Sequence, residues 1–201
     1  MRLINPHPVR PYPLILILRD LCALCGNTQT VIEFIENREI YERVIRELIP
    51  QAEEFVWIAT ADIKDLHVDS GRSFRPFLGV LDDLVREGVA IRLLHAKEPG
   101  PRFRDDFDQY PALLQGLERN LCPRVHLKTV VVDGKAAYLG SANLTGAGMG
   151  AKNKDRRNFE SGIVTDDPGM VTPILEQFDK IWMGSWCGTC QRRDYCPDPI
   201  G

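Results

Sequence analysis

Several chemically reactive side chains fall close together within residues 126–145, which read HLKTVVVDGKAAYLGSANLT. His126 and Lys128 are two positions apart, as are Ser141 and Asn143, so each pair would share one face of a β-strand. An imidazole, an ammonium, a hydroxyl and an amide on one face can together bind and attack a phosphodiester. The spacing of these side chains therefore predicts a site directed at phosphodiesters.

The same stretch has the pattern of a β-hairpin. Residues 126–132 alternate and are rich in valine, which is typical of a strand. Asp133-Gly134 is a strong signal for a two-residue turn, because both residues tolerate a positive φ. Residues 136–143 would form the returning strand. We expect Asp133 and Gly134, together with Gly140, to have structural roles rather than chemical ones.

A two-residue turn fixes which residues lie opposite each other. It would pair His126 with Ser141 and Lys128 with Leu139, which brings all the reactive side chains to one face. A shift of one residue would put Ala142 opposite His126 and break the cluster. The hypothesis of a shared face therefore depends on the register of the hairpin.

Length and composition limit the class of protein. The chain has 201 residues, 44% of them hydrophobic, and a net charge of −3, which argues against coating nucleic acid through bulk positive charge. The early apolar run Leu14–Leu18 is too short to span a membrane and is a poor signal-peptide core. We therefore expect a cytoplasmic protein without stable membrane insertion.

Strands and helices alternate around the hairpin. The apolar runs, N-caps and breakers predict an α/β layered fold with a mostly buried sheet. Asn37 is expected to cap the first helix. The expected strands are 30–35, 55–60, 89–94 and 159–165, and the expected helices are 37–48, 76–87, 111–119 and 173–183.

The motif His126-x-Lys128-x4-Asp133-Gly134, followed by Gly140-Ser141-x-Asn143, resembles the signature of the phospholipase D superfamily. Residues 52–62 and 84–94 also look like the early strand-helix-strand unit of that family. The resemblance covers roughly residues 28–183. It implies an α/β/α sandwich with a mixed, mostly buried sheet, and catalysis through a phosphohistidine intermediate.

The resemblance also implies roles for individual side chains. His126 would be the nucleophile, and Lys128 would stabilise charge on the phosphate. Ser141 and Asn143 would hydrogen-bond the phosphate or position the histidine. Glu160 would accept a hydrogen bond from the imidazole and so fix its tautomer.

The reaction needs a second histidine to protonate the leaving oxygen. Among His7, His67, His95 and His126, only His126 is followed by the full x-Lys-x4-Asp-Gly pattern. Short members of the family pair two chains, so the resemblance implies a homodimer in which two copies of His126 share one active site.

The most favoured activity is that of a metal-independent nuclease on DNA or RNA. Basic side chains directly after the hairpin would hold a backbone phosphate: Lys152, Lys154, Arg156 and Arg157. A phospholipase D-type lipid hydrolase is one alternative. A non-catalytic nucleic-acid-binding or scaffold module is another.

Cysteines are concentrated in two terminal extensions, residues 1–27 and 184–201, outside a catalytic domain at 28–183. Cys22 and Cys25 form one C-x-x-C pair, and Cys187, Cys190 and Cys196 form C-x2-C-x5-C. Two such pairs suit a structural zinc ion. The C-terminal spacing also resembles the iron–sulfur staple of some nucleases, so a [4Fe–4S] cluster is the alternative. Cys122 is expected to be a small buried residue beside the hairpin.

Overall fold

The computed structural model describes residues 30–64, 66–69, 71 and 73–200. Residues 32–201 form one compact unit. The expected apolar segment Leu14–Leu18 and the first cysteine pair, Cys22 and Cys25, lie outside the described residues.

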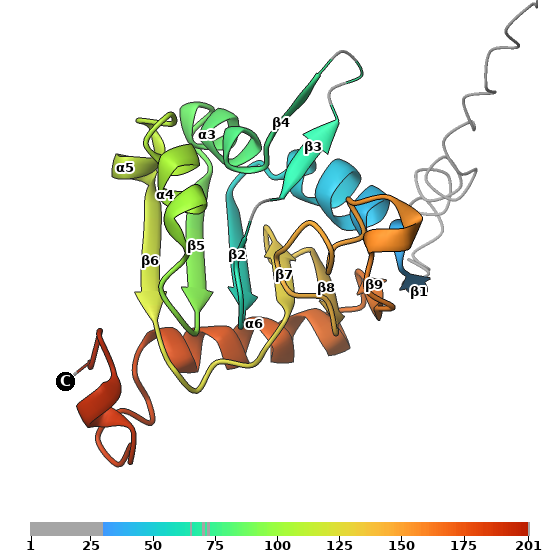
Figure 1. Cartoon of the computed structure of the whole chain (residues 1–201). Helices are drawn as coiled ribbons and strands as arrows, with labels where there is room; N and C mark the ends of the chain where they lie inside the picture. Colours follow the sequence, from blue (N-terminus) through green and yellow to red (C-terminus); the bar gives the residue numbers. More distant parts are fainter. Residues whose placement is uncertain (1–29, 65, 70, 72, 201) are drawn as a thin grey trace, which may run out of the picture. The chain divides into compact units, whose positions relative to one another are not determined.

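A mixed sheet forms the centre of this unit (Figure 1). Among the described residues it contains seven strands in the order β1-β9-β8-β7-β2-β5-β6. Strands β2, β5 and β6 are parallel, and the other neighbouring pairs are antiparallel. The strands are β1 (Ile32–Glu36), β2 (Phe55–Thr60), β5 (Ala90–His95), β6 (Leu117–Leu121), β7 (Thr129–Val132), β8 (Ala136–Gly140) and β9 (Ser161–Thr165).

Helices cover both faces of the sheet, which makes the fold an α/β/α sandwich, as the sequence predicts (Figure 1). One face carries α2 (Arg38–Ile40), the π-helix η2 (Tyr41–Leu48), the 3-10 turn η3 (Ile49–Gln51) and α3 (Leu78–Arg86). The other face carries α6 (Pro168–Trp182). The remaining elements are the β3 (His67–Asp69) and β4 (Phe74–Pro76) ribbon, α4 (Pro101–Phe107), α5 (Leu113–Gly116), η4 (Lys154–Arg156) and η5 (Arg193–Tyr195).

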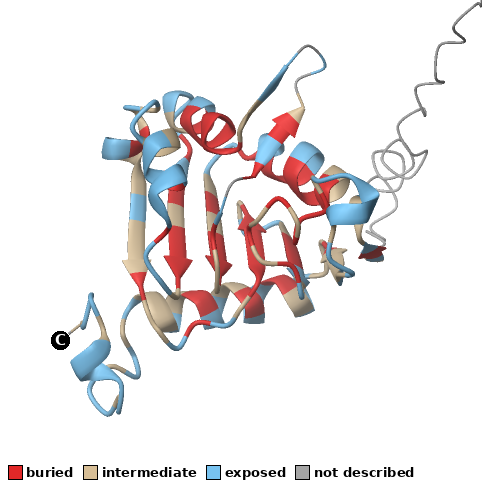
Figure 2. Cartoon of the chain, in the orientation of Figure 1, coloured by how far each residue is buried: buried red, intermediate tan, exposed pale blue. Residues whose placement is uncertain are grey.

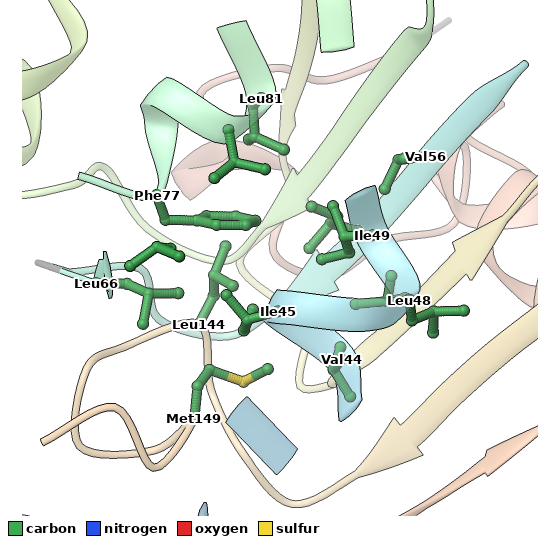
Figure 3. Close-up of a cluster of buried hydrophobic side chains, with 14 of the residues drawn as sticks. Val44, Ile45, Leu48, Ile49, Val56, Leu66, Phe77, Leu81, Leu144 and Met149 are labelled. Carbon is green, nitrogen blue, oxygen red and sulfur yellow. The ribbon is translucent and has the colours of Figure 1, made fainter. Parts of the chain in front are cut away.

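The larger core lies between the sheet and the η2 and α3 side (Figures 2 and 3). Ile45 and Phe77 meet there with Leu144 and Met149, which belong to the segment after β8 (Figure 3). Leu144 is 3% exposed and Met149 is 1% exposed, so these two side chains anchor the segment in the core. The anchoring matters because Ser141 and Asn143 lie in the same segment.

Asn37 precedes the first helix as expected, but its side chain does not cap that helix. Its φ is +49°, and its main-chain N–H donates to the carbonyl oxygen of Glu160 at 2.8 Å. Its side-chain Oδ1 also accepts from the N–H of Glu160 at 3.3 Å. Asn37 therefore ties the start of the helix to the segment that carries the candidate carboxylate.

The helix expected at 111–119 is wrong in its second half, where Leu117–Leu121 forms strand β6 beside β5. Pairing with the open edge of β5 outweighs local helix propensity there. The last helix begins at Pro168, earlier than expected, because the Asp167 carboxylate accepts from the N–H of Gly169 at 2.8 Å and caps it. The helix continues through Pro173.

Candidate active site

The hairpin differs from expectation by one residue in register. Val132 pairs with Ala136 and Thr129 with Leu139, so three residues, 133–135, form the turn. The N–H of Gly140 donates to the carbonyl oxygen of Lys128 at 3.1 Å, which sets these two residues opposite each other. The predicted pairings of His126 with Ser141 and Lys128 with Leu139 are therefore wrong.

The cluster survives this shift because its members lie beyond the ends of the paired strands. His126 precedes β7, and Ser141 follows β8. Ser141 is held by Ser161 of β9, whose carbonyl oxygen accepts from the Ser141 N–H at 3.0 Å, and not by β7.

Asp133 anchors the turn to the rest of the sheet. Its φ is +53°, and its carboxylate accepts from the N–H groups of Glu53, Glu54 and Phe55 at 3.0, 2.8 and 2.8 Å. Burial alone would raise the pKa of Asp133, but these backbone donors and the charge of Lys135 outweigh burial and lower that pKa. The carboxylate thus fastens the hairpin to the start of β2.

His126 and Lys128 are presented by an extended segment whose alternate side chains are packed away. Val125 is buried against Phe178 of α6, and Leu127 packs in the same cluster. The period of two puts His126 and Lys128 on the same side of this segment, where His126 is exposed and Lys128 is only 8% exposed. The histidine ring is therefore accessible on a fixed backbone.

The Lys128 ammonium contacts its neighbour directly. Nζ donates to the carbonyl oxygen of His126 at 2.7 Å and lies 3.3 Å from the Nδ1 atom of the ring. Burial lowers the pKa of Lys128, and the negative charge of Glu160 opposes that shift. Lys128 thus links the imidazole to the carboxylate electrostatically, and it lies where it can also meet an anionic ligand.

Glu160 has partners other than the expected imidazole. Among the described residues, its carboxylate accepts from the Ser141 hydroxyl and from Nδ2 of Asn158, the latter at 3.1 Å. The N–H of Ser161 donates to Oγ of Ser141 at 3.1 Å. These contacts fix the hydroxyl and the carboxylate in one polar group, and no hydrogen bond from His126 reaches Glu160 in this part of the chain.

Asn143 is positioned by Thr60, at the end of β2. The Thr60 hydroxyl lies 3.5 Å from Oδ1 of Asn143 and accepts from the N–H of Leu144 at 3.0 Å. The same hydroxyl donates to the carbonyl oxygen of Asp62 at 2.8 Å. A buried hydroxyl therefore joins the central strand to the loop that carries the candidate ligands.

A pair of glycines explains why the motif requires Gly140. Gly140 faces Gly162 across β8 and β9, and the Tyr138 ring lies over both. A Cβ atom on Gly140 would stand 2.2 Å from the Tyr138 hydroxyl oxygen. Burial also raises the pKa of Tyr138 to about 12, so this hydroxyl stays neutral. Only glycine leaves room for the ring beside Ser141.

The expected phosphate-binding cations follow the site in sequence. Lys152, Lys154 and Arg156 are exposed, and Arg157 is half-buried. The N–H of Asn158 donates to the carbonyl oxygen of Ala147 at 3.1 Å, which holds the end of this basic loop against the segment after β8. The loop therefore leads directly into the polar group around Glu160.

The described cysteines lie apart from these side chains. Cys122, Cys187, Cys190 and Cys196 are unpaired thiols and all are half-buried, so the expectation that Cys122 is a buried residue is wrong. Within the described ranges, no three histidine, cysteine or acidic side chains already stand at metal-binding geometry.

Sequence reasoning missed two positioning residues, Thr60 and Asn158. Thr60 ends an apolar strand, and a single hydroxyl at a strand end gives no sequence signal for a role in a site. Asn158 precedes Glu160 by two positions, and this same-face spacing was the available signal.

The sandwich and this cluster define a phospholipase D-like protein. The family model described as "Cardiolipin synthase, PLD-like domain" matches residues 45–182, and the chain belongs to the phospholipase D superfamily. A relative in Chlamydomonas reinhardtii, a mitochondrial cardiolipin hydrolase, is 26% identical over 104 residues. That match covers 51% of this chain and 44% of the relative, so less than half of the relative's length is represented.

Solved structures share the fold. NucT from Helicobacter pylori has a TM-score of 0.55 at 18% identity, and covers 76% of this chain and 95% of its own. The phospholipase D family member Nuc from Salmonella typhimurium has a TM-score of 0.57 at 16% identity. The match covers 77% of this chain and 95% of Nuc. The archaeal chromatin protein TrmBL2, whose structure shows a mode of DNA binding, has a TM-score of 0.52 at 17% identity. The match covers 84% of this chain and 59% of TrmBL2.

Proposed function

We propose that this chain hydrolyses phosphodiester bonds in nucleic acid through a covalent phosphohistidine at His126. The observation that carries the proposal is the contact between the exposed His126 ring and the buried Lys128 ammonium, beside the Ser141–Glu160 group. The site joins a nucleophile, a cation for the phosphate and hydrogen-bond donors.

The first step is attack on phosphorus by the Nε2 atom of His126. A new N–P bond forms while the bond from phosphorus to the leaving oxygen breaks, and that oxygen takes a proton from a general acid. Lys128 Nζ turns from the imidazole toward a non-bridging oxygen, which frees Nδ1 to carry the ring proton. Glu160 and Ser141 then stabilise the protonated ring or hold the phosphate. In the second step water attacks phosphorus while the N–P bond breaks, and the group that served as general acid, now deprotonated, takes the proton of the water, which regenerates His126.

The general acid in this proposal is His126 of a second copy of the chain. The sequence has a single His-x-Lys-x4-Asp-Gly motif, and His95, which also has a lysine two positions later, is fully buried, so one chain supplies half of the site. Two-fold symmetry would bring two equivalent imidazoles to one phosphate, with one attacking and the other protonating.

An apolar row on the sheet supports such pairing. Phe34 and Leu139 both lie opposite Ile163, so the three side chains share one face across β1, β9 and β8. Phe34 is 65% exposed and Leu139 is 38% exposed, and Phe159, next to Glu160, is 98% exposed. Exposed apolar side chains of this size mark interaction surfaces. Leu139 lies two positions before Ser141 and Phe159 directly precedes Glu160, which suits an interface that completes the site.

The basic loop favours a polyanion as the substrate. Exposed Lys152, Lys154 and Arg156 lead into the site and would hold phosphates adjacent to the scissile one. A single-headgroup lipid has no such adjacent phosphates. In this proposal the cations would contact the nucleic-acid backbone beyond the reacting bond.

A lipid phosphodiester is the second candidate. The description of the matching family model and the cardiolipin hydrolase relative both favour it, and cardiolipin carries two phosphodiesters. In the described part of the chain, no helix is long and apolar enough to cross a membrane. The two candidates share the chemistry at His126 and differ in what the basic loop contacts.

A substrate panel in EDTA tests the proposal. Single- and double-stranded DNA, RNA and cardiolipin vesicles are incubated with the wild type and with His126→Ala. We expect cleavage of nucleic acid in the chelator and a loss of about 10³-fold or more in the variant. His67→Ala is the matched control and keeps full activity. Release from cardiolipin alone would favour the lipid hydrolase, and binding without turnover that depends on His126 would refute catalysis.

A further inference from the structure

The C-terminal tail, residues 184–200, is attached to the chain without a hydrophobic core of its own. No residue in this described segment is buried. The cysteines are nevertheless among its least exposed members, since Cys187, Cys190 and Cys196 are half-buried while most of their neighbours are exposed. Something other than apolar burial must hold such a segment.

Polar contacts bring the tail onto the loop that follows β6. The N–H of Leu121 donates to Oδ2 of Asp198 at 2.9 Å, and the Cys196 thiol lies 3.7 Å from the Leu121 carbonyl oxygen. Nη1 of Arg192 donates to the carbonyl oxygen of Pro123 at 3.3 Å. These partners lie on either side of Cys122 in the sequence.

A further contact joins the same two segments. Nη1 of Arg124 lies 3.7 Å from Sγ of Cys190. Cys190 and Cys196 are thus each connected to the Cys122 loop by a separate contact.

We propose that Cys122, Cys187, Cys190 and Cys196 bind one Zn²⁺ ion that staples the tail to the loop leading to His126. Cys122 replaces the N-terminal cysteines as the source of the fourth thiolate. Four thiolates, two of them from a C-x2-C turn, match the tetrahedral coordination that zinc takes in structural sites. The dication would also offset the mutual repulsion of the clustered thiolates.

Binding requires a modest local closure. Within the described residues no three of these thiols stand at metal-binding geometry, so the turn at 187–190 would rotate its sulfurs toward Cys122. Each ligand gives up its proton on binding, and the metal takes four S–Zn bonds. Its ligand Cys122 lies four positions before His126 in the sequence, so the bound ion would hold in place the loop that leads to the nucleophile.

Metal content of the purified full chain tests the site independently of any phosphodiesterase activity. We expect about one zinc per chain in the wild type, as for a closed four-thiolate site. Cys122→Ser should lose most of that zinc. The double variant Cys22→Ser/Cys25→Ser should retain it. Zinc that persists in Cys122→Ser, or that is lost in the double variant, would overturn the assignment.

Cobalt substitution separates loss of a ligand from loss of folding. Co²⁺ added to metal-free protein should give the sulfur-to-metal charge-transfer absorption of four thiolates. Cys122→His keeps a ligand at this position, so we expect retained binding with a weaker charge-transfer band. An unchanged band would exclude Cys122 from the site. Iron with inorganic sulfide, in place of zinc, in the purified wild type would overturn the choice of metal.

Discussion

Replacing Asp133 by asparagine should loosen the hairpin from β2. Asparagine also tolerates the positive φ of +53° at this position, so the change isolates the carboxylate. Oδ1 can still accept from Glu54 and Phe55, but the new amide N–H₂ group would face the N–H of Glu53, which now donates to Oδ2 at 3.0 Å. One charge-assisted bond is lost and two are weakened.

The expected loss of stability follows from these contacts. A hydrogen bond to a charged group contributes about 1.5–3 kcal/mol, and partial exposure of the Asp133 carboxylate reduces this contribution. We therefore expect Asp133→Asn to lower the free energy of unfolding by about 2 kcal/mol at pH 7. For a chain of this length the melting temperature should fall by about 4–8 °C.

The stabilisation by the Asp133 carboxylate should decrease as the pH falls. The pKa of Asp133 is lowered in the folded state, so its stabilisation is present above the unfolded pKa of about 4 and is lost as the pH falls through the folded pKa. Urea unfolding followed by circular dichroism, from pH 7 down to pH 3, should show the gap between wild type and variant closing in acid. Asp105→Asn, at an exposed position on α4, is the matched control.

The reasoning would be refuted by either of two results. Asp133→Asn could destabilise the protein no more than Asp105→Asn does. Alternatively, the loss of stability could stay constant across the whole pH range. Either outcome would show that the charge of the carboxylate does not hold the hairpin to the start of β2.

Three further substitutions test other contacts. Gly140→Ala should destabilise the protein by about 1–3 kcal/mol in urea unfolding, because its Cβ would stand 2.2 Å from the Tyr138 hydroxyl oxygen. Thr60→Val leaves the N–H of Leu144 without its partner at 3.0 Å, so about 1–3 kcal/mol should be lost, and kcat should fall more than KM changes. Phe34→Glu should lower the mass measured by light scattering from dimer toward monomer and reduce activity in parallel. Unchanged unfolding curves for the first two, or a dimer that resists the third, would contradict these assignments.

The sequence pattern predicts the layered α/β fold well because buried strands have a strong local signal. Phe55–Thr60 is almost continuously apolar, and the structure makes it a strand between two neighbours. The strand Leu117–Leu121 could not be found in this way, since its residues suit a helix and only the edge of β5 selects the extended form. A strand that forms only by pairing with a partner distant in the sequence cannot be predicted from its own residues.

The candidate site also has one part that the sequence predicts and another part that depends on distant contacts. Residue types and spacing identify His126 and Lys128, and the structure places the two side chains in contact. The register of the hairpin could not be obtained, because the turn length depends on contacts that Asp133 makes far away in the sequence. The partners of Glu160 were also beyond reach, since they depend on how the Asn158 segment returns to Ser141.

Covalent capture of the intermediate is the most direct test of the central claim. A labelled oligonucleotide is mixed with enzyme in EDTA, quenched in alkali to preserve the N–P bond, and the protein is digested for mass spectrometry. We predict a phosphoryl adduct on the peptide that contains His126, formed and lost at rates that match turnover, and absent from His126→Asn. Cleavage at the wild-type rate by His126→Asn, or an adduct on another residue, would contradict the account.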